Sequence, residues 1–101
     1  MDLEALMQQA QALQQQALEA QERVARREVT GEAGGGLVKV TVTGAMHVTR
    51  VELDPVTVTD IDMLQDLITA ATNDALKKAK DMMAEAMGPL AQMMKQSGFN
   101  P

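Results

Sequence analysis

The spacing of apolar side chains changes twice along this 101-residue chain, and that change constrains its fold more than any other feature. Up to residue 27, apolar and small residues recur every three or four positions, which is typical of a helix. Between residues 28 and 54 they alternate with polar residues, as in half-buried strands, and helical spacing returns from residue 59. The order predicts an α+β protomer, α-β-β-β-α, in a single domain over residues 1–101.

Residues 1–27 form the first predicted helix, which no glycine or proline interrupts. Glutamines, which are good helix formers, occupy much of its remaining surface. A helix that is polar on most sides buries one narrow apolar seam against a partner. The seam consists of Leu3, Leu6, Ala10, Leu13, Ala17, Ala20 and Val24.

Residues 28–54 predict a three-stranded antiparallel meander with strands over residues 28–33, 37–43 and 47–53. β-Branched residues are frequent in the second and third of these segments, and glycine-containing turns separate all three. Pro55 ends the third strand because proline cannot continue a sheet ladder.

Residues 59–87 form the second predicted helix, with Thr59 as the N-cap and Asp62 three positions later. Its apolar stripe consists of Leu64, Ile68, Ala71, Ala75, Ala79, Met82 and Ala86. Gly88 and Pro89 end it, and residues 88–101 are expected to be a flexible tail.

Two helices of this length, roughly 35–40 Å each, extend well beyond a three-stranded sheet. Their apolar seams therefore predict a second chain, and we expect a homodimer. The residues expected at its interface are Leu3, Leu6, Leu13, Leu64, Ile68 and Met82.

The composition excludes several kinds of site. The chain has no cysteine and one histidine, His47, so thiol chemistry, disulfides, zinc–thiolate sites and sites with two imidazoles are ruled out. The triple glycine at residues 34–36 is followed by a strand instead of a helix, which argues against a phosphate-binding loop. Helix capping and solvation account for the carboxylates. We therefore expect no catalytic residue, metal, cofactor or small-molecule substrate, and no enzyme activity.

No apolar run approaches the roughly 18–20 residues that cross a bilayer, and the acidic N-terminus does not resemble a signal peptide. We expect a cytoplasmic protein with no membrane partner.

The net charge is −5, which argues against nucleic acid, but the charge is distributed in blocks, and two of them are basic. These blocks supply the candidate phosphate contacts Arg23, Arg26, Arg27, Lys77, Lys78 and Lys80. A solvated surface, with the arginines complementing the helix dipole, is the alternative interpretation.

The second helix and the residues after it also contain the methionine pairs Met82-Met83 and Met93-Met94. Methionines adapt to irregular surfaces, so these pairs indicate either packing, within the protomer or across a dimer, or a groove for a separate partner.

Three segments carry a family resemblance. They are residues 34–44 (GGGLVKVTVTG), 51–55 (VELDP) and 66–75 (DLITAATNDA), which resemble the YbaB/EbfC family of bacterial nucleoid-associated proteins in order and spacing. The resemblance implies a tweezer-like homodimer with projecting helices that binds double-stranded DNA in the nucleoid, compacts DNA or influences gene expression, and makes its contacts through the helices.

Because no helix-turn-helix, zinc finger or stacking aromatic cluster is visible, those contacts are expected to be mainly to phosphates, with weak sequence preference. The alternative is a protein–protein adaptor that grips a partner with its methionine-rich helices, for example in replication or recombination assemblies.

Overall fold

The computed structural model describes residues 2–86 and 88, and it confirms the predicted α-β-β-β-α order. Helix α1 spans Leu3–Arg26, and helix α2 spans Ile61–Ala86. Between them lie the strands β1 (Glu28–Ala33), β2 (Val38–Thr43) and β3 (Val48–Leu53), followed by the short 3-10 helix η1 (Pro55–Thr59). The tail expected over residues 88–101, with Met93 and Met94, lies outside the described residues apart from Gly88.

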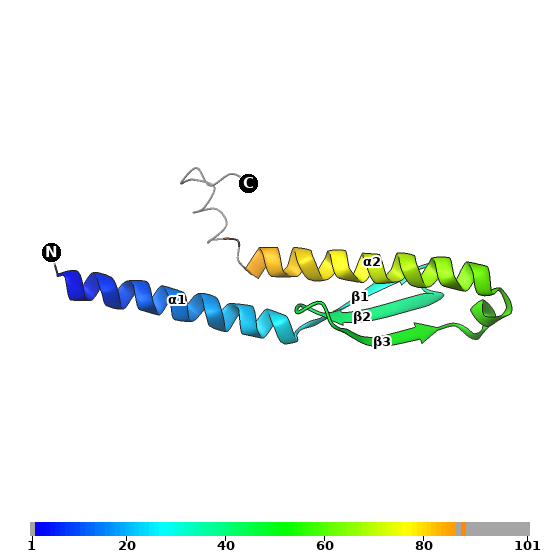
Figure 1. Cartoon of the computed structure of the whole chain (residues 1–101), viewed down its shortest axis with the longest axis horizontal. Coiled ribbons are helices and arrows are strands. Elements are labelled where there is room, and N and C mark those ends of the chain that lie inside the picture. The colour runs from blue at the N-terminus through cyan, green and yellow to red at the C-terminus, as the bar shows by residue number, and fades with distance from the viewer. Residues whose placement is uncertain (1, 87, 89–101) are drawn as a thin grey trace.

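The three strands form one antiparallel sheet in the order β1-β2-β3 (Figure 1). Gly34, Gly35 and Gly36 turn the chain between β1 and β2 with φ of 66°, 69° and 94°, values that residues other than glycine rarely adopt. A bulge at Thr41 and Val42 shifts the register between β2 and β3.

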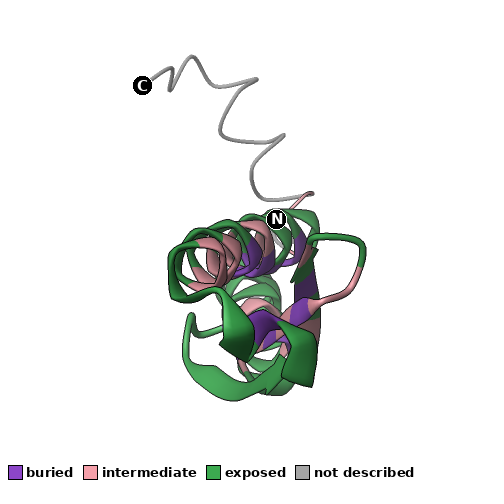
Figure 2. Ribbon diagram, turned by 90° about the vertical axis from the view of Figure 1, so that its right-hand side faces the viewer, coloured by how far each residue is buried: buried purple, intermediate pink, exposed green. Residues whose placement is uncertain are grey.

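The core lies between the sheet and α2. Val38, Val40 and Val42 of β2 are fully buried against Ala71, Ala75 and Ala79 of α2. The alanines let the helix approach the sheet closely. A Cβ added at Gly31 of β1 would overlap the backbone N of Ala75 and the backbone O of Ala71. In Figure 2 the buried ribbon is concentrated where α2 faces the strands.

Helix α1 projects from the end of the sheet as a rod and gives the chain an elongated shape, 71 × 26 × 15 Å (Figure 1). The radius of gyration is 19.4 Å, compared with about 13 Å for a compact chain of this length. Among the residues that the structure describes, only the last turns of α1 contact the rest of the protein, where Val24 is buried next to Gly44. The leucines of its seam are exposed, namely Leu3 (71%), Leu6 (47%) and Leu13 (65%).

The predicted N-cap of the second helix was wrong by one residue. Thr59 belongs to η1, where its hydroxyl donates to the Val56 carbonyl at 2.7 Å. The N-cap of α2 is Asp60 instead, whose Oδ1 accepts the Met63 N–H at 3.1 Å. The later start of α2 is due to η1. This 3-10 helix is capped by Asp54, whose Oδ1 accepts the Val56 N–H, and it includes residues up to Thr59, so α2 begins after it.

Candidate nucleic-acid interface

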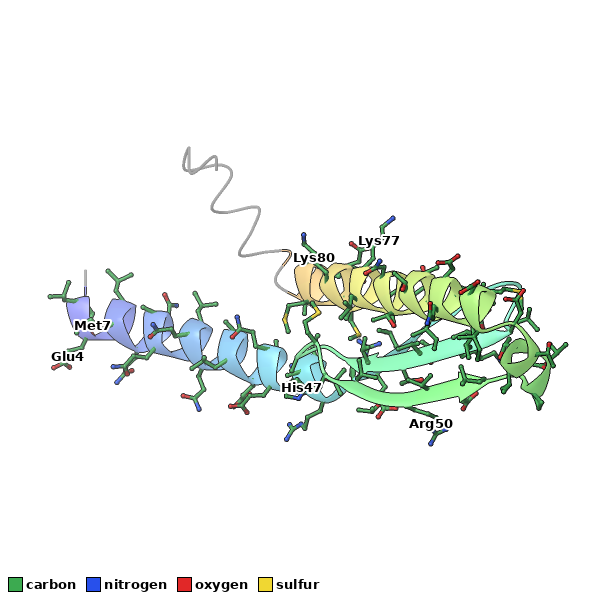
Figure 3. The ribbon with its side chains drawn as sticks, turned by 45° about the vertical axis from the view of Figure 1, so that its right-hand side comes forward. Glu4, Met7, His47, Arg50, Lys77 and Lys80 are labelled. Atoms are coloured by element: carbon green, nitrogen blue, oxygen red, sulfur yellow. The ribbon has the colours of Figure 1, made fainter. Side chains whose placement is uncertain are left out.

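Two lysines of α2 lie on its outer surface, Lys77 and Lys80. Lys77 and Lys80 point away from the sheet (Figure 3) and are exposed. They are three positions apart and therefore lie on neighbouring parts of the same helix face. Because this surface faces solvent and not the protomer, both ammonium groups can approach an external anion.

Lys78 is only one residue away but lies at the edge of the sheet. Its Nζ donates to the carbonyl of Thr30 in β1 at 3.1 Å and pairs with Asp74 at 3.2 Å. Successive residues of a helix differ in direction by about 100°, which separates Lys78 from the face of Lys77. Lys78 thus contacts the edge of the sheet, whereas Lys77 and Lys80, with which the sequence prediction grouped it, face away from the sheet.

Asp74 completes this contact and is the residue that the sequence prediction missed. Its Oδ2 accepts the N–H of Glu32 in β1 at 3.0 Å as well as the Lys78 ammonium. The Glu32 N–H first, and Lys78 second, hold the pKa of Asp74 below its ordinary value. The spacing of Asp74 and Lys78 by four residues indicates an ion pair, but nothing in the sequence indicates that both reach a strand.

Arg23, Arg26 and Arg27 are exposed where α1 leads into β1. The first two lie in the last turn of the helix, where cations complement the helix dipole, and Arg27 is its C-cap. Within residues 2–86 and 88, ion pairs are confined to Arg50–Glu52 and Asp74–Lys78. The three arginines, Lys77 and Lys80 therefore have no carboxylate within ion-pair distance in the described part of the chain.

The sheet surface opposite α2 is polar and carries mixed charge. Thr30 and Thr41 share a hydrogen bond at its centre, and Arg50 pairs with Glu52 at 3.3 Å. The side chains around this shallow concavity are Glu28, Thr30, Glu32, Lys39, Thr41, Arg50 and Glu52. Carboxylates surround both cations there, so this surface is less suited to a polyanion than the outer face of α2.

The expected interface residues fall into two groups. Leu64 and Ile68 are half-buried against the protomer's own core, and Met82 is 9% exposed, so these three already pack within the protomer. Leu3, Leu6 and Leu13 have no such cover.

His47 is exposed in the turn before β3. No cluster of three or more possible metal-ligating side chains occurs among the described residues, and no helix there is long and apolar enough to cross a membrane.

The structure thus defines an elongated α+β protomer with exposed cations on both helices. Comparison with known proteins specifies it further. The family model described as the YbaB/EbfC DNA-binding family matches residues 1–94. This chain belongs to that family.

Relatives at about half identity support this assignment. A nucleoid-associated protein of Rhodococcus erythropolis is 49% identical over 92 residues, which cover 89% of this chain and 82% of the relative. One from Corynebacterium jeikeium is 48% identical over 100 residues, or 97% of this chain and 96% of the relative. The crystal structure of an uncharacterized protein from Helicobacter pylori shares the fold, with a TM-score of 0.68 and 23% identity over 93% of this chain and 97% of that one.

Proposed function

We propose that this protein binds double-stranded DNA as a nucleoid-associated homodimer in the cytoplasm. The observation that carries the proposal is the pair Lys77 and Lys80, which project from α2 and form no ion pair within residues 2–86 and 88, on a chain whose net charge is −5. The family description and the names of the relatives support DNA as the polyanion. Compaction of DNA or an influence on gene expression would follow from such binding.

The contacts are proposed to be mainly with phosphates and to have weak sequence preference. Lysine and arginine side chains on a convex helix surface reach the DNA backbone, whereas reading a base sequence requires an element seated in a groove. Arg23, Arg26 and Arg27 are the second proposed set of contacts, and Lys78 is left out because Asp74 and Thr30 hold it. Met82 packs inside the protomer, so the adaptor alternative loses one of its methionines.

The proposal of a homodimer is based on the exposed apolar seam of α1. Its exposed seam of Leu3, Leu6 and Leu13 is costly in water unless another chain covers it, and the rod projects far enough to act as one arm of a tweezer-like pair.

A salt series tests the DNA contacts. The affinity of the wild type and of the double variant K77Q/K80Q for a duplex of about 30 base pairs is measured by fluorescence anisotropy between about 50 and 300 mM salt. The slope of log K, the logarithm of the association constant, against log salt is negative. In K77Q/K80Q its magnitude should be smaller by about 2 for each protomer in contact, because each lysine that binds a phosphate releases about one counterion. The matched control K39Q/R50Q removes the same charge from the mixed-charge sheet surface and should keep the wild-type slope.

An unchanged slope in K77Q/K80Q contradicts contact through the outer face of α2. Wild-type binding that does not respond to salt, or no binding at 50 mM salt, contradicts phosphate contact altogether and favours the adaptor.

A further inference from the structure

The apolar seam of α1 is covered along one half of the helix and bare along the other. Toward the end of the helix, Val24 is buried, and Ala17 and Ala20 are half-buried. Toward the start, Leu6 and Leu13 of the same seam are 47% and 65% exposed. Residues of one seam face the same way, so the element that covers Val24 and Ala17 stops short of Leu13.

That element is the C-terminal end of α2. Helix α2 runs antiparallel to α1, and its last turns lie beside the second half of α1 (Figure 1). Ala79 and Met82 are buried there, and Met83 and Ala86 are half-buried. They continue the core face of α2 past the end of the sheet. The cover of the α1 seam therefore ends where α2 ends, at Ala86.

The sequence that follows Gly88 repeats the apolar spacing of the last turns of α2. Leu90, Met93 and Met94 have the i, i+3, i+4 spacing of one helix face. The polar positions between and beside them are Gln92, Lys95 and Gln96. Pro89 cannot continue α2 but suits the first turn of a new helix. The pattern therefore predicts a short amphipathic helix that starts at Pro89.

The length of this segment matches the bare part of the seam. Residues 3–16 of α1 extend about 20 Å, and the thirteen residues 89–101 reach about as far when helical. Helix α2 points toward the start of α1 where it ends, so a segment that continues its direction passes over Leu13 first and Leu6 next (Figure 1). Phe99, the one aromatic residue of the chain, then comes to the level of Leu3.

The charges favour the same placement. Every charged side chain in residues 2–22 is acidic, and two of them, Asp2 and Glu4, lie at the start of α1. Residues 89–101 contain one charged side chain, Lys95. A segment that runs toward the start of α1 brings Lys95 closer to Asp2 and Glu4. Such exposed attraction contributes little free energy, but its sign agrees with the direction that the length requires.

We infer that residues 89–99 pack on the exposed seam of α1 in the same chain, with Leu90, Met93 and Met94 against Leu13 and Leu6. Methionine side chains adapt to an irregular surface such as this alternation of leucine and alanine. An isolated helix is marginal in water, and α1 projects without other cover among the described residues. The arm is then a pair of helices, which stabilises the first half of α1.

The segment and the second chain of the proposed homodimer take different sides of α1. Met7 and Leu18 are 59% and 57% exposed. They are turned by roughly 100° or more around the helix from Leu6 and Leu13. One short helix covers a single face, so Met7 and Leu18 stay open for another chain. The inference goes beyond the proposed DNA binding and does not depend on it.

Amide hydrogen exchange in the full chain tests the packing. L90S/M94S removes the apolar contacts, and Q92S/Q96S makes two substitutions to the same residue on the polar side. Without the contacts, the first half of α1 is a single helix that opens readily. We expect the amides of residues 6–13 to exchange at least tenfold faster in L90S/M94S and at the wild-type rate in Q92S/Q96S.

The amides of β2 show in the same spectra whether each variant is folded. Wild-type exchange of residues 6–13 in a folded L90S/M94S chain overturns the inference. Equal acceleration in the two variants also overturns it, because the effect would then not come from the apolar face.

A nitroxide attached at Q96C tests which chain supplies the segment. The chain has no cysteine, so this label is the single one per chain. When the isotopically enriched chain itself carries the label, we expect paramagnetic broadening of the amides of residues 3–10. In a mixture of enriched chains without label and labelled chains without enrichment, the same amides should stay sharp. Broadening in the mixture as well assigns the segment to the second copy and overturns the inference, as does absence of broadening in both samples.

Both measurements are made without DNA. An α1 that is not covered by residues 89–99 therefore leaves the proposed DNA contact to its own salt test, and a changed salt slope in K77Q/K80Q does not bear on the packing of the segment.

Discussion

Asp74 and Lys78, one helical turn apart on α2, form an ion pair of 3.2 Å, and each also bonds to the outer edge of β1. Asp74 accepts from the Glu32 N–H and Lys78 donates to the Thr30 carbonyl, so two edge groups that could pair with another strand are occupied. The pair fixes α2 to the sheet and closes one of its two edges.

The Asp74 carboxylate should make stability depend on pH in the acid range. Its pKa in the folded protein lies below the ordinary value of about 4, chiefly because of the Glu32 N–H. The stabilisation is therefore present above about pH 4 and is lost as the pH falls through the folded-state pKa. D74N should have a lower Tm than the wild type at pH 7, and the difference should shrink below about pH 4. A Tm difference that stays constant between pH 3 and pH 7 would contradict this.

Neutralising the adjacent lysines should separate stability from DNA binding. K78M removes the contact with Asp74 and Thr30 and should lower the Tm while leaving the salt slope of DNA binding unchanged. K77M should leave the Tm unchanged and reduce the slope by about 1 for each protomer in contact. Thermal unfolding and anisotropy on the same preparations measure both effects. Equal effects of the two variants on the slope would contradict the different roles of Lys77 and Lys78.

A side chain at Gly31 should disrupt the contact between β1 and α2. The added Cβ of G31A meets backbone atoms of Ala71 and Ala75, which cannot move aside by a rotamer change. We expect a loss of about 3 kcal/mol in the free energy of unfolding, measured in urea, because overpacking displaces the helix. G88A is the control, since no atom lies within 4 Å of a Cβ there. Wild-type stability of G31A would show that α2 can shift without cost.

The hydroxyl of Thr57 should stabilise the turn that leads into α2. Thr57 is fully buried, and its Oγ1 donates to the Asp54 carbonyl at 2.7 Å. T57V keeps the shape and loses the bond, which should cost about 1 kcal/mol. T59V loses a bond of the same length to Val56 at an exposed position, where water replaces it, and should cost less than about 0.5 kcal/mol. Urea unfolding of the two variants side by side measures the difference, and equal losses would contradict the role of burial.

Much of the fold was predictable because it depends on local spacing. Alternation from Val38 to Val42 and the glycines at residues 34–36 define a strand and its turn without reference to distant residues. The start of α2 was not predictable to the residue, since Thr59 and Asp60 are both good caps and η1 decided between them. The segments that carry the family resemblance, residues 34–44, 51–55 and 66–75, contain the glycine turn, β2 and the core alanines Ala71 and Ala75.

The candidate site was predictable only in part. The sequence by itself determined the kinds and order of the elements, the positions of the basic blocks and the apolar seam of α1, because each follows from the spacing of neighbouring residues. The tertiary structure decided that Lys77 points away from the sheet while Lys78 contacts Asp74 and Thr30. It also decided that Val40 is buried while Val51, its partner in the sheet, is exposed. Both outcomes depend on where α2 lies on the sheet. One helix is wide enough to cover about two strands and packs on them with one of its faces. No local sequence pattern specifies which of the three strands the helix leaves uncovered.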